Sequence, residues 1–114
     1  MHEYHKAVEW VEKANKEAAE KGAAKVKTLH VIFGESSGYS PEVVKNYFDE
    51  AAAGTASEGA EFQITVTRSM LKCPQCGKLF EKKLLDYKCP DCGVEGNPTE
   101  SGNEVELTEV ECGQ

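Results

Sequence analysis

The sequence lacks any apolar run close to the roughly 20 residues that a membrane-spanning helix needs. Its first residues, Met1-His2-Glu3-Tyr4-His5, also lack the basic segment followed by an apolar one that is typical of a secretion signal. These two absences predict a cytoplasmic protein with no membrane partner. With 114 residues, of which 39% are hydrophobic, the chain can form a modest core but not a large enzyme with a deep pocket.

Positive charge is scarce, since 13 Lys and Arg residues oppose 20 Asp and Glu residues and the formal net charge is −7. Nucleic-acid binding depends on clustered Lys and Arg, so this balance predicts no nucleic-acid partner. One local exception is a group of lysines around the cysteine motifs: Lys72, Lys78, Lys82, Lys83 and Lys88. We interpret them as a solvated face; the alternative is a zinc-ribbon interaction module that uses them to bind nucleic acid or a protein partner.

Two cysteine pairs share one pattern, Cys73-Pro-Gln-Cys76-Gly and, after twelve intervening residues, Cys89-Pro-Asp-Cys92-Gly. Each Cys-x-x-Cys turn directs two thiolates to one point, and the following glycine permits the positive φ that lets backbone amides approach the sulfurs. Four thiolates close a tetrahedron around Zn²⁺ with no position left for water. The spacing therefore predicts a structural zinc site, in preference to a redox dithiol pair or an iron–sulfur cluster.

The predicted zinc module is small. A segment of roughly 20 to 25 residues is shorter than the roughly 40 that usually fold without metal or disulfides, so bound zinc would supply the missing stability. Its expected apolar core consists of Leu79, Phe80, Leu84 and Leu85. The fifth cysteine, Cys112, is expected to have no role in the site.

The N-terminus is rich in nitrogen donors. Met1 should be retained, because the enzyme that trims initiator methionine prefers a small second residue and His2 is large. The free amine, the His2 amide and the His2 imidazole then suit a square-planar Ni(II) or Cu(II) site, with Glu3 adding a carboxylate and His5 one turn further on. Such an exposed site would release metal more readily than four cysteines, which favours delivery over catalysis and predicts no enzymatic activity.

Two segments have the periodicity of amphipathic helices. The first helix is expected over residues 3–21, with Gly22 as its stop. Its apolar stripe consists of Tyr4, Val8, Val11, Ala14 or Asn15, and Ala18. The second helix should follow the capping residue Ser40, with Pro41 at its first position, and end at Gly54. Its inward residues would be Val44, Tyr47, Phe48 and Ala51.

Three segments have the composition of strands. Residues 26–33 are rich in β-branched and apolar side chains, and residues 62–67 alternate between apolar and polar. The alternation would turn Phe62, Ile64 and Val66 toward a core. A last strand is expected over residues 104–111, with Val105 and Leu107 on one side.

The order of these elements predicts an α+β fold. A small mixed sheet with two helices would carry an inserted zinc-ribbon module, with the last strand returning to the N-terminal sheet. We expect an α/β domain formed by residues 1–69 and 104–114, and a zinc-ribbon domain formed by residues 70–103.

Several short motifs occur together in an order typical of one family. They are Met1-His2-Glu3, Val31-Ile-Phe-Gly34-Glu35, Gly54-Thr55-Ala-Ser-Glu58-Gly59-Ala60, the two Cys-Pro-x-Cys-Gly knuckles and Gly102-Asn103-Glu104. In these motifs the chain resembles, nearly from end to end, the HypA family of hydrogenase nickel-incorporation proteins, which are nickel metallochaperones.

The resemblance implies a nickel domain and a zinc domain. Nickel would be held by His2, with backbone nitrogens at the Met1 end and Glu3 contributing, and zinc by the four cysteines. It also implies partnership with the GTPase HypB and delivery of nickel to the large subunit of [NiFe]-hydrogenase. Some relatives also serve urease, so urease maturation factors are a further implied partner.

The chain departs from the family pattern at two places. Some members have a nickel-binding acidic residue where this chain has Ser40-Pro41, and Glu42 is the nearest acid; His5 or the amine of Met1 could take that role. Some members have a histidine after a Cys-x-x-Cys turn where this chain has glycine, so we expect plain four-cysteine zinc coordination. His30, within a predicted strand, is interpreted as a packed or surface residue, and Glu35 as a loop acid.

Overall fold

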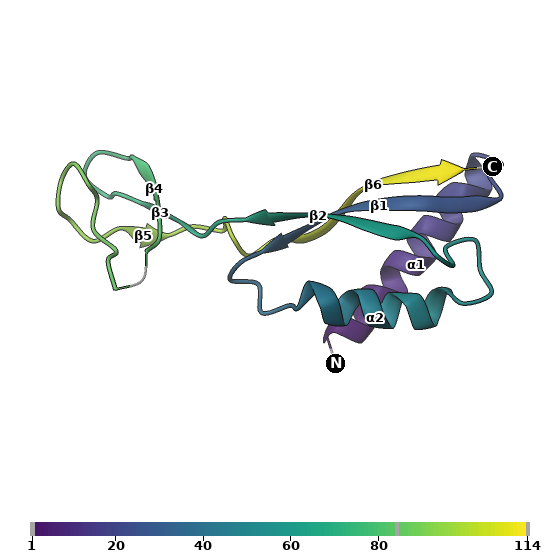
Figure 1. Ribbon diagram of the computed structural model, residues 1–114. Helices are drawn as coiled ribbons and strands as arrows, with labels where there is room; N and C mark the ends of the chain where they lie inside the picture. Colours follow the sequence, from purple (N-terminus) through teal and green to yellow (C-terminus); the bar gives the residue numbers. More distant parts are fainter. Residues whose placement is uncertain (1, 84, 114) are drawn as a thin grey trace. The chain divides into compact units, whose positions relative to one another are not determined.

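The computed structural model describes residues 2–83 and 85–113 and divides the chain into two compact units (Figure 1). The first unit comprises Met1–Ile32, Tyr39–Thr65 and Val105–Gln114, and the second comprises Phe33–Gly38 and Val66–Glu104. Among the described residues, no helix is both long and apolar enough to cross a membrane.

The first unit contains helix α1 (His2–Glu20), whose buried face is Ala7, Trp10, Val11, Ala14 and Ala18. The predicted helix is confirmed, but its buried stripe is rotated from the predicted one, since Tyr4 is 49% exposed and Val8 is only partly buried. The reason is the single tryptophan. Trp10 is 1% exposed, and burying this large side chain turns the alanine-rich side of the helix inward.

Helix α2 (Pro41–Ala52) begins as the sequence predicts. The Ser40 hydroxyl accepts a hydrogen bond from the Val43 amide at 3.3 Å, and proline stands in the first turn, where its missing N–H costs nothing. The helix ends at Ala52, just before the expected Gly54. Its fully buried residues are Val44, Phe48 and Ala52, while Tyr47 and Ala51 are partly buried.

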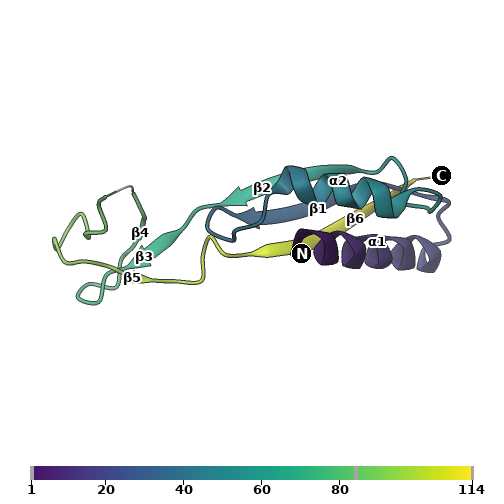
Figure 2. The same ribbon diagram turned by 90° about the horizontal axis from the view of Figure 1, so that it is seen from below.

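The sheet is three-stranded, with the order β2-β1-β6, and consists of β1 (Lys25–Gly34), β2 (Glu61–Thr67) and β6 (Val105–Gly113). Figures 1 and 2 show both helices on one face of it, with β1 and β2 running in one direction and β6 in the other. This confirms the predicted mixed sheet with two helices, and the return of the last strand to it.

The turn between α2 and β2 is held by a hydrogen bond to helix α1. Ser57, which is 0% exposed, donates a hydrogen bond of 2.6 Å from its hydroxyl to the amide oxygen of Asn15 on α1. Asn15 is therefore a polar partner beside the apolar stripe. The buried hydroxyl of Ser57, inside the Gly54–Ala60 motif, is thus satisfied by a partner on α1.

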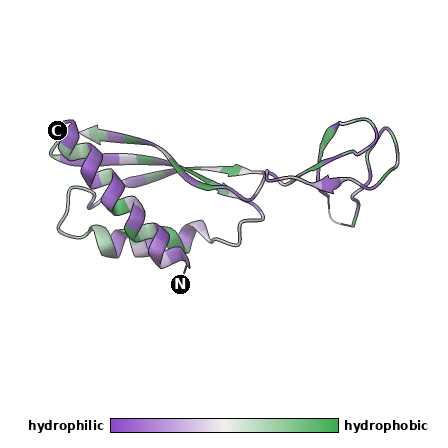
Figure 3. Ribbon diagram, turned by 180° about the vertical axis from the view of Figure 1, so that it is seen from behind, coloured by the Kyte–Doolittle hydropathy of each residue, from purple (hydrophilic) through white to green (hydrophobic). Residues whose placement is uncertain are grey.

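Hydropathy alternates along the sheet strands (Figure 3), but this alternation overestimates how much of β2 is covered. Phe62 packs against Phe48 and Trp10, with ring centroids 5.0 and 5.8 Å apart. Ile64 and Val66 are 44% and 57% exposed, so the prediction that they face a core is wrong. Because β2 is an edge strand, only Phe62 reaches the aromatic side chains of the helices.

The last strand also has a different buried residue from the expected ones. Val110 is 4% exposed, whereas Val105 and Leu107 are only partly buried. Near this position the ammonium of Lys21, the residue that follows α1, donates to the Val110 carbonyl at 3.5 Å. Among the described residues of β6, Val110 is the one that is fully buried, so the expected pair, Val105 and Leu107, does not form the covered part of this strand.

The second unit contains a small antiparallel sheet of order β4-β3-β5, formed by β3 (Met70–Lys72), β4 (Leu79–Glu81) and β5 (Asn97–Pro98). Leu71 pairs with Phe80 across β3 and β4, and both are buried together with Cys73 and Cys89.

The predicted core of this module is therefore mostly wrong. Phe80 is buried, but Leu79 is 56% exposed because its neighbour on the strand takes the inner face. Leu85 is 90% exposed, at a φ of 63° in the turn closed by Lys83 and Asp86. Leu84 lies outside the described residues. Leu71, outside the expected list, supplies the missing apolar surface.

Two glycine motifs pack against each other in the second unit. The Gly34 amide donates to the Glu104 carbonyl at 2.6 Å, and the Ser36 amide donates to the Gly102 carbonyl at 2.7 Å. A Cβ placed on Gly34 would lie 2.1 Å from the Gly102 oxygen, which no side chain can tolerate. Gly34 and Gly102 are therefore needed for a close backbone approach.

The acids of these motifs hold the same region together. The Glu35 carboxylate accepts from the Ser69 amide at 2.8 Å, so this residue has a structural role as well as a loop position. The pKa of Glu104 is lowered because its carboxylate accepts from its own backbone N–H, from the Thr67 hydroxyl and from the amides of Gly102 and Asn103.

Candidate metal centres

The two cysteine knuckles have the same backbone geometry. In the first, the Gly77 amide donates to the Cys73 carbonyl at 2.9 Å; in the second, the Gly93 amide donates to the Cys89 carbonyl at 2.8 Å. The two glycines have φ of 77° and 71°, in the left-handed region that an L side chain rarely adopts. Each repeat is thus a tight turn, and this explains the glycine after each pair.

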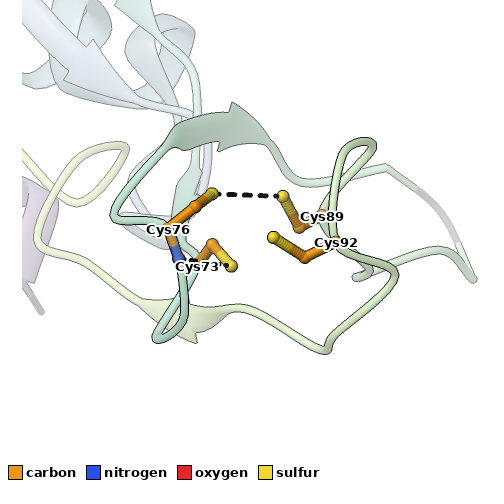
Figure 4. A group of neighbouring side chains, drawn as sticks. All are labelled: Cys73, Cys76, Cys89 and Cys92. Atoms are coloured by element: carbon orange, nitrogen blue, oxygen red, sulfur yellow. Dashed lines mark hydrogen bonds between the residues drawn. The ribbon is translucent and has the colours of Figure 1, made fainter.

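The four sulfur atoms converge from these two turns (Figure 4). All lie within 4.8 Å of one another, and the Sγ atoms of Cys76 and Cys89 are 3.8 Å apart. Tetrahedral zinc with Zn–S bonds of about 2.3 Å separates its sulfurs by about 3.8 Å. Cys73 and Cys89 are almost fully buried, with 1% and 2% exposed. Geometry, donor type and burial all fit a closed, structural zinc site, in which the metal would cross-link the two turns.

The pKa values of two of these thiols, Cys73 and Cys92, are shifted in opposite directions. The pKa of Cys73 is lowered to about 7, first by the Cys76 amide, which donates to its sulfur at 3.4 Å, and also by the Gln75 amide at the same distance. The pKa of Cys92 is raised to about 12, chiefly by its hydrogen bond with Cys76. Crowded thiols resist losing all their protons unless a cation neutralises the thiolates, which is what zinc would do.

The lysines around this site are partly engaged within the chain. The Lys78 ammonium lies 3.1 Å from a carboxylate oxygen of Asp91, and this pair raises the pKa of Lys78. The Lys82 ammonium lies 5.4 Å from the centroid of the Tyr87 ring, within cation–π range. All five of these lysines are exposed, as a solvated face requires.

The predicted nickel residues lie at the start of α1. His2 is exposed, and its ring centroid lies 6.2 Å from that of Tyr39 in the loop before α2. Glu3 is partly buried in the first turn, and His5 is exposed. Met1 lies outside the described residues. The loop that precedes α2 is thus close to the His2 ring within the first unit.

Two residues named for the departure from the family pattern, Ser40 and Glu42, lie at the start of α2. Ser40 is the N-cap of α2, and Glu42 is an exposed acid in its first turn. Cys112 is partly buried on β6. Ser40 therefore has a structural role, because its hydroxyl caps α2.

Metal-ligating side chains gather at two places among the described residues. One is the four-cysteine group, and the other consists of His30, Glu109 and Glu111. Sequence reasoning missed the second group. His30 and the two glutamates are about 80 positions apart, and no local spacing signal connects them.

Comparison with known proteins gives a consistent answer. The family model described as "Hydrogenase/urease nickel incorporation, metallochaperone, hypA" matches residues 1–112. The hydrogenase maturation factor HypA of Caldanaerobacter subterraneus subsp. tengcongensis is 38% identical over 96 residues, which is 84% of each chain. That of Roseiflexus sp. is 34% identical over 112 residues, covering 97% of this chain and 91% of the relative.

Solved structures agree with these sequence matches. A HypA protein solved in solution superposes with a TM-score of 0.74 at 25% identity, over 98% of this chain and 96% of the other. The nickel metallochaperone HypA from Helicobacter pylori has the same fold, with a TM-score of 0.62. Together with the match over nearly the whole length, these likenesses show that the chain belongs to the HypA family.

Proposed function

We propose that this chain is a nickel metallochaperone, which binds Ni(II) at its N-terminus and delivers it for the maturation of [NiFe]-hydrogenase. The observation that carries the proposal is the family match from residue 1 to residue 112, in a chain whose exposed His2 begins the first helix. The family is described by nickel incorporation and its relatives by hydrogenase maturation, and both descriptions support the same role.

The proposed nickel ligands are the amine of Met1, the backbone and side-chain nitrogens of His2, and the carboxylate of Glu3. The first amides of a helix have no hydrogen-bond partner within the helix, so the amides at the start of α1 are available to a metal. Nitrogen donors in one short segment suit square-planar Ni(II). The exposure of His2 gives a partner direct access to the ion.

We further propose a division between the two parts of the chain. Residues 1–69 and 104–114 would form the nickel-binding α/β domain, and residues 70–103 the zinc-ribbon domain. Zinc would be held by Cys73, Cys76, Cys89 and Cys92, whose spacing of sulfurs fits a tetrahedral ion. The zinc would be structural and the nickel would be the cargo.

The proposed partners are the GTPase HypB and the large subunit of [NiFe]-hydrogenase. The family description names urease beside hydrogenase, so urease maturation factors are a second class of partner to test. The chain itself would carry metal without catalysing a reaction.

Nickel titration of protein with its authentic N-terminus tests the ligand set. We expect one Ni(II) per zinc-loaded chain at the N-terminus, at least a tenfold weaker affinity in His2→Ala, and loss of this binding when a tag precedes Met1. Glu12→Ala is the matched control, since Glu12 is an exposed residue of the same helix outside the proposed ligands, and His5→Ala tests separately whether His5 contributes a ligand. Undiminished N-terminal nickel binding in His2→Ala, located by NMR shifts of the first helical turn, would contradict the proposal.

The delivery role is tested in cells. In a host that lacks its own HypA, the wild-type chain should restore hydrogenase activity and His2→Ala should not, while excess nickel in the medium should bypass the defect. If His2→Ala restores activity at low nickel as well as the wild-type chain does, N-terminal nickel delivery is wrong.

A further inference from the structure

A second group of metal-ligating side chains lies on the sheet of the first unit. His30 is on β1, and Glu109 and Glu111 are on the neighbouring strand β6. The hydroxyl of Thr108 donates to the His30 carbonyl at 3.1 Å, so the two strands are in direct contact here. One ligand atom from each of the three side chains lies within 4.8 Å of the other two.

The three side chains are on the face of the sheet away from the helices. The neighbours of His30 along β1, Leu29 and Val31, are 0% and 1% exposed, so the alternation of a strand places the histidine on the outer face. Val110 is likewise 4% exposed between the two glutamates. The group is therefore open to solvent on one side and supported by packed strands on the other.

Their chemistry suits a divalent ion of the nickel and zinc class. One imidazole and two carboxylates are borderline and hard donors, which such ions accept in a single coordination sphere. The two glutamates bring two negative charges to one spot. The Nε2 atom of His30 is already in contact with an Oε2 atom of Glu111, so the histidine and one carboxylate are directed to the same point.

We propose that His30, Glu109 and Glu111 form an additional divalent-cation site on this chain, with water completing the coordination sphere. The site is independent of the proposed N-terminal nickel site, since it uses other residues. The side chains of His30 and Glu111 are 26% and 44% exposed, which leaves room for the water ligands and for rapid exchange of the ion. Three protein ligands on an open surface make a weaker and more readily exchanged site than the four-cysteine cage.

The test uses full-length, zinc-loaded His2→Ala protein, in which the N-terminal site is impaired, and Ni(II) as the probe. Octahedral Ni(II) is paramagnetic and broadens nearby amide signals in NMR spectra. We expect saturable broadening centred on His30 and on residues 108–112. His30→Ala and Glu111→Gln should each weaken this binding at least tenfold.

Glu106→Gln is the matched control, since Glu106 is an exposed glutamate on the same strand but outside the group. It should leave the nickel affinity unchanged, and the metal-free spectra of all variants show whether the fold is retained. The proposal is overturned if nickel causes no broadening near His30 and Glu111, in which case these residues form only an ion pair. It is also overturned if His30→Ala binds nickel there as tightly as Glu106→Gln does.

Discussion

Two glycines, Gly34 and Gly102, determine how closely two backbone segments of the second unit can pack. Gly34 and Gly102 belong to motifs far apart in the sequence, yet the amide of Gly34 and the carbonyl of Gly102 both bond to the opposing segment. Gly102 has a φ of 91°, and a Cβ on it would lie 2.6 Å from the Cα of Ser69. The presence of glycine at these two positions therefore has a steric cause.

Gly34→Ala should lower the free energy of unfolding by about 1–3 kcal/mol, the usual range for forcing extra atoms into a packed region. The added methyl group would meet the Gly102 carbonyl at 2.1 Å, and the backbone must shift to relieve it. Urea denaturation followed by NMR signals of the second unit measures this loss. Gly113→Ala is the control, because a Cβ there would have no neighbour within 4 Å. Equal stability of the two variants would show that the two segments separate easily.

At the scale of elements, aromatic contacts between α1, α2 and β2 hold the first unit together. Phe48 is 0% exposed and lies against Phe62, which in turn contacts Trp10. Each element contributes one ring, so the cluster joins both helices to the edge strand. Only one residue of β2 takes part, although its alternation offers three apolar side chains.

Phe48→Ala should therefore cost about 3–5 kcal/mol of unfolding free energy, the usual cost of removing a buried phenylalanine. Val66→Ala, on the 57% exposed part of β2, should cost less than about 0.5 kcal/mol, as at other surface positions. Fluorescence of the single tryptophan during urea denaturation reports both values. A large cost at Val66 would mean that the outer part of β2 is covered in solution.

Elements whose structure depends on neighbouring residues could be predicted from the sequence, whereas the burial of β2 could not. Helix α2 was predictable because its start depends on two adjacent residues, Ser40 and Pro41, whose capping chemistry is local. The cysteine site was predictable for the same reason, since spacing alone fixes each turn. Alternation along β2 identified residues that share a face, but whether a helix covers that face depends on distant packing, so Ile64 and Val66 were assigned wrongly.

Nonlocal contacts account for the remaining differences. Leu71 replaced Leu79 in the core of the second unit because strand pairing, which the sequence does not specify, set it opposite Phe80. His30 acquired two carboxylate neighbours only because β6 returns beside β1. The N-terminal nickel ligands and the domain boundaries proposed from the sequence stay predictions.

At the scale of the whole molecule, the two units differ in what stabilises them. The first has a core of aromatic and aliphatic side chains from two helices and a sheet. Among the described residues, the hydrophobic cluster at the cysteine site consists of Leu71, Phe80, Cys73 and Cys89, with Cys92 packed against it. A module with so few apolar contacts depends on its metal for folding. The stability of the two units should therefore respond differently to chelation.

Removal of zinc from the wild-type protein with a strong chelator should collapse the dispersed amide signals of residues 73–98. The signals of Trp10, Leu29 and Phe48 should stay in place, because their burial does not involve the metal. Cys92→Ser should behave like the chelated protein, since three thiolates and a hydroxyl hold zinc poorly. Cys112→Ser should keep its zinc, because this cysteine lies outside the four-sulfur group. If residues 73–98 remained ordered after complete zinc loss, the metal would not be structural. If the signals of both units collapsed, their stabilities would be linked, and zinc would also control the unit that we propose to bind nickel.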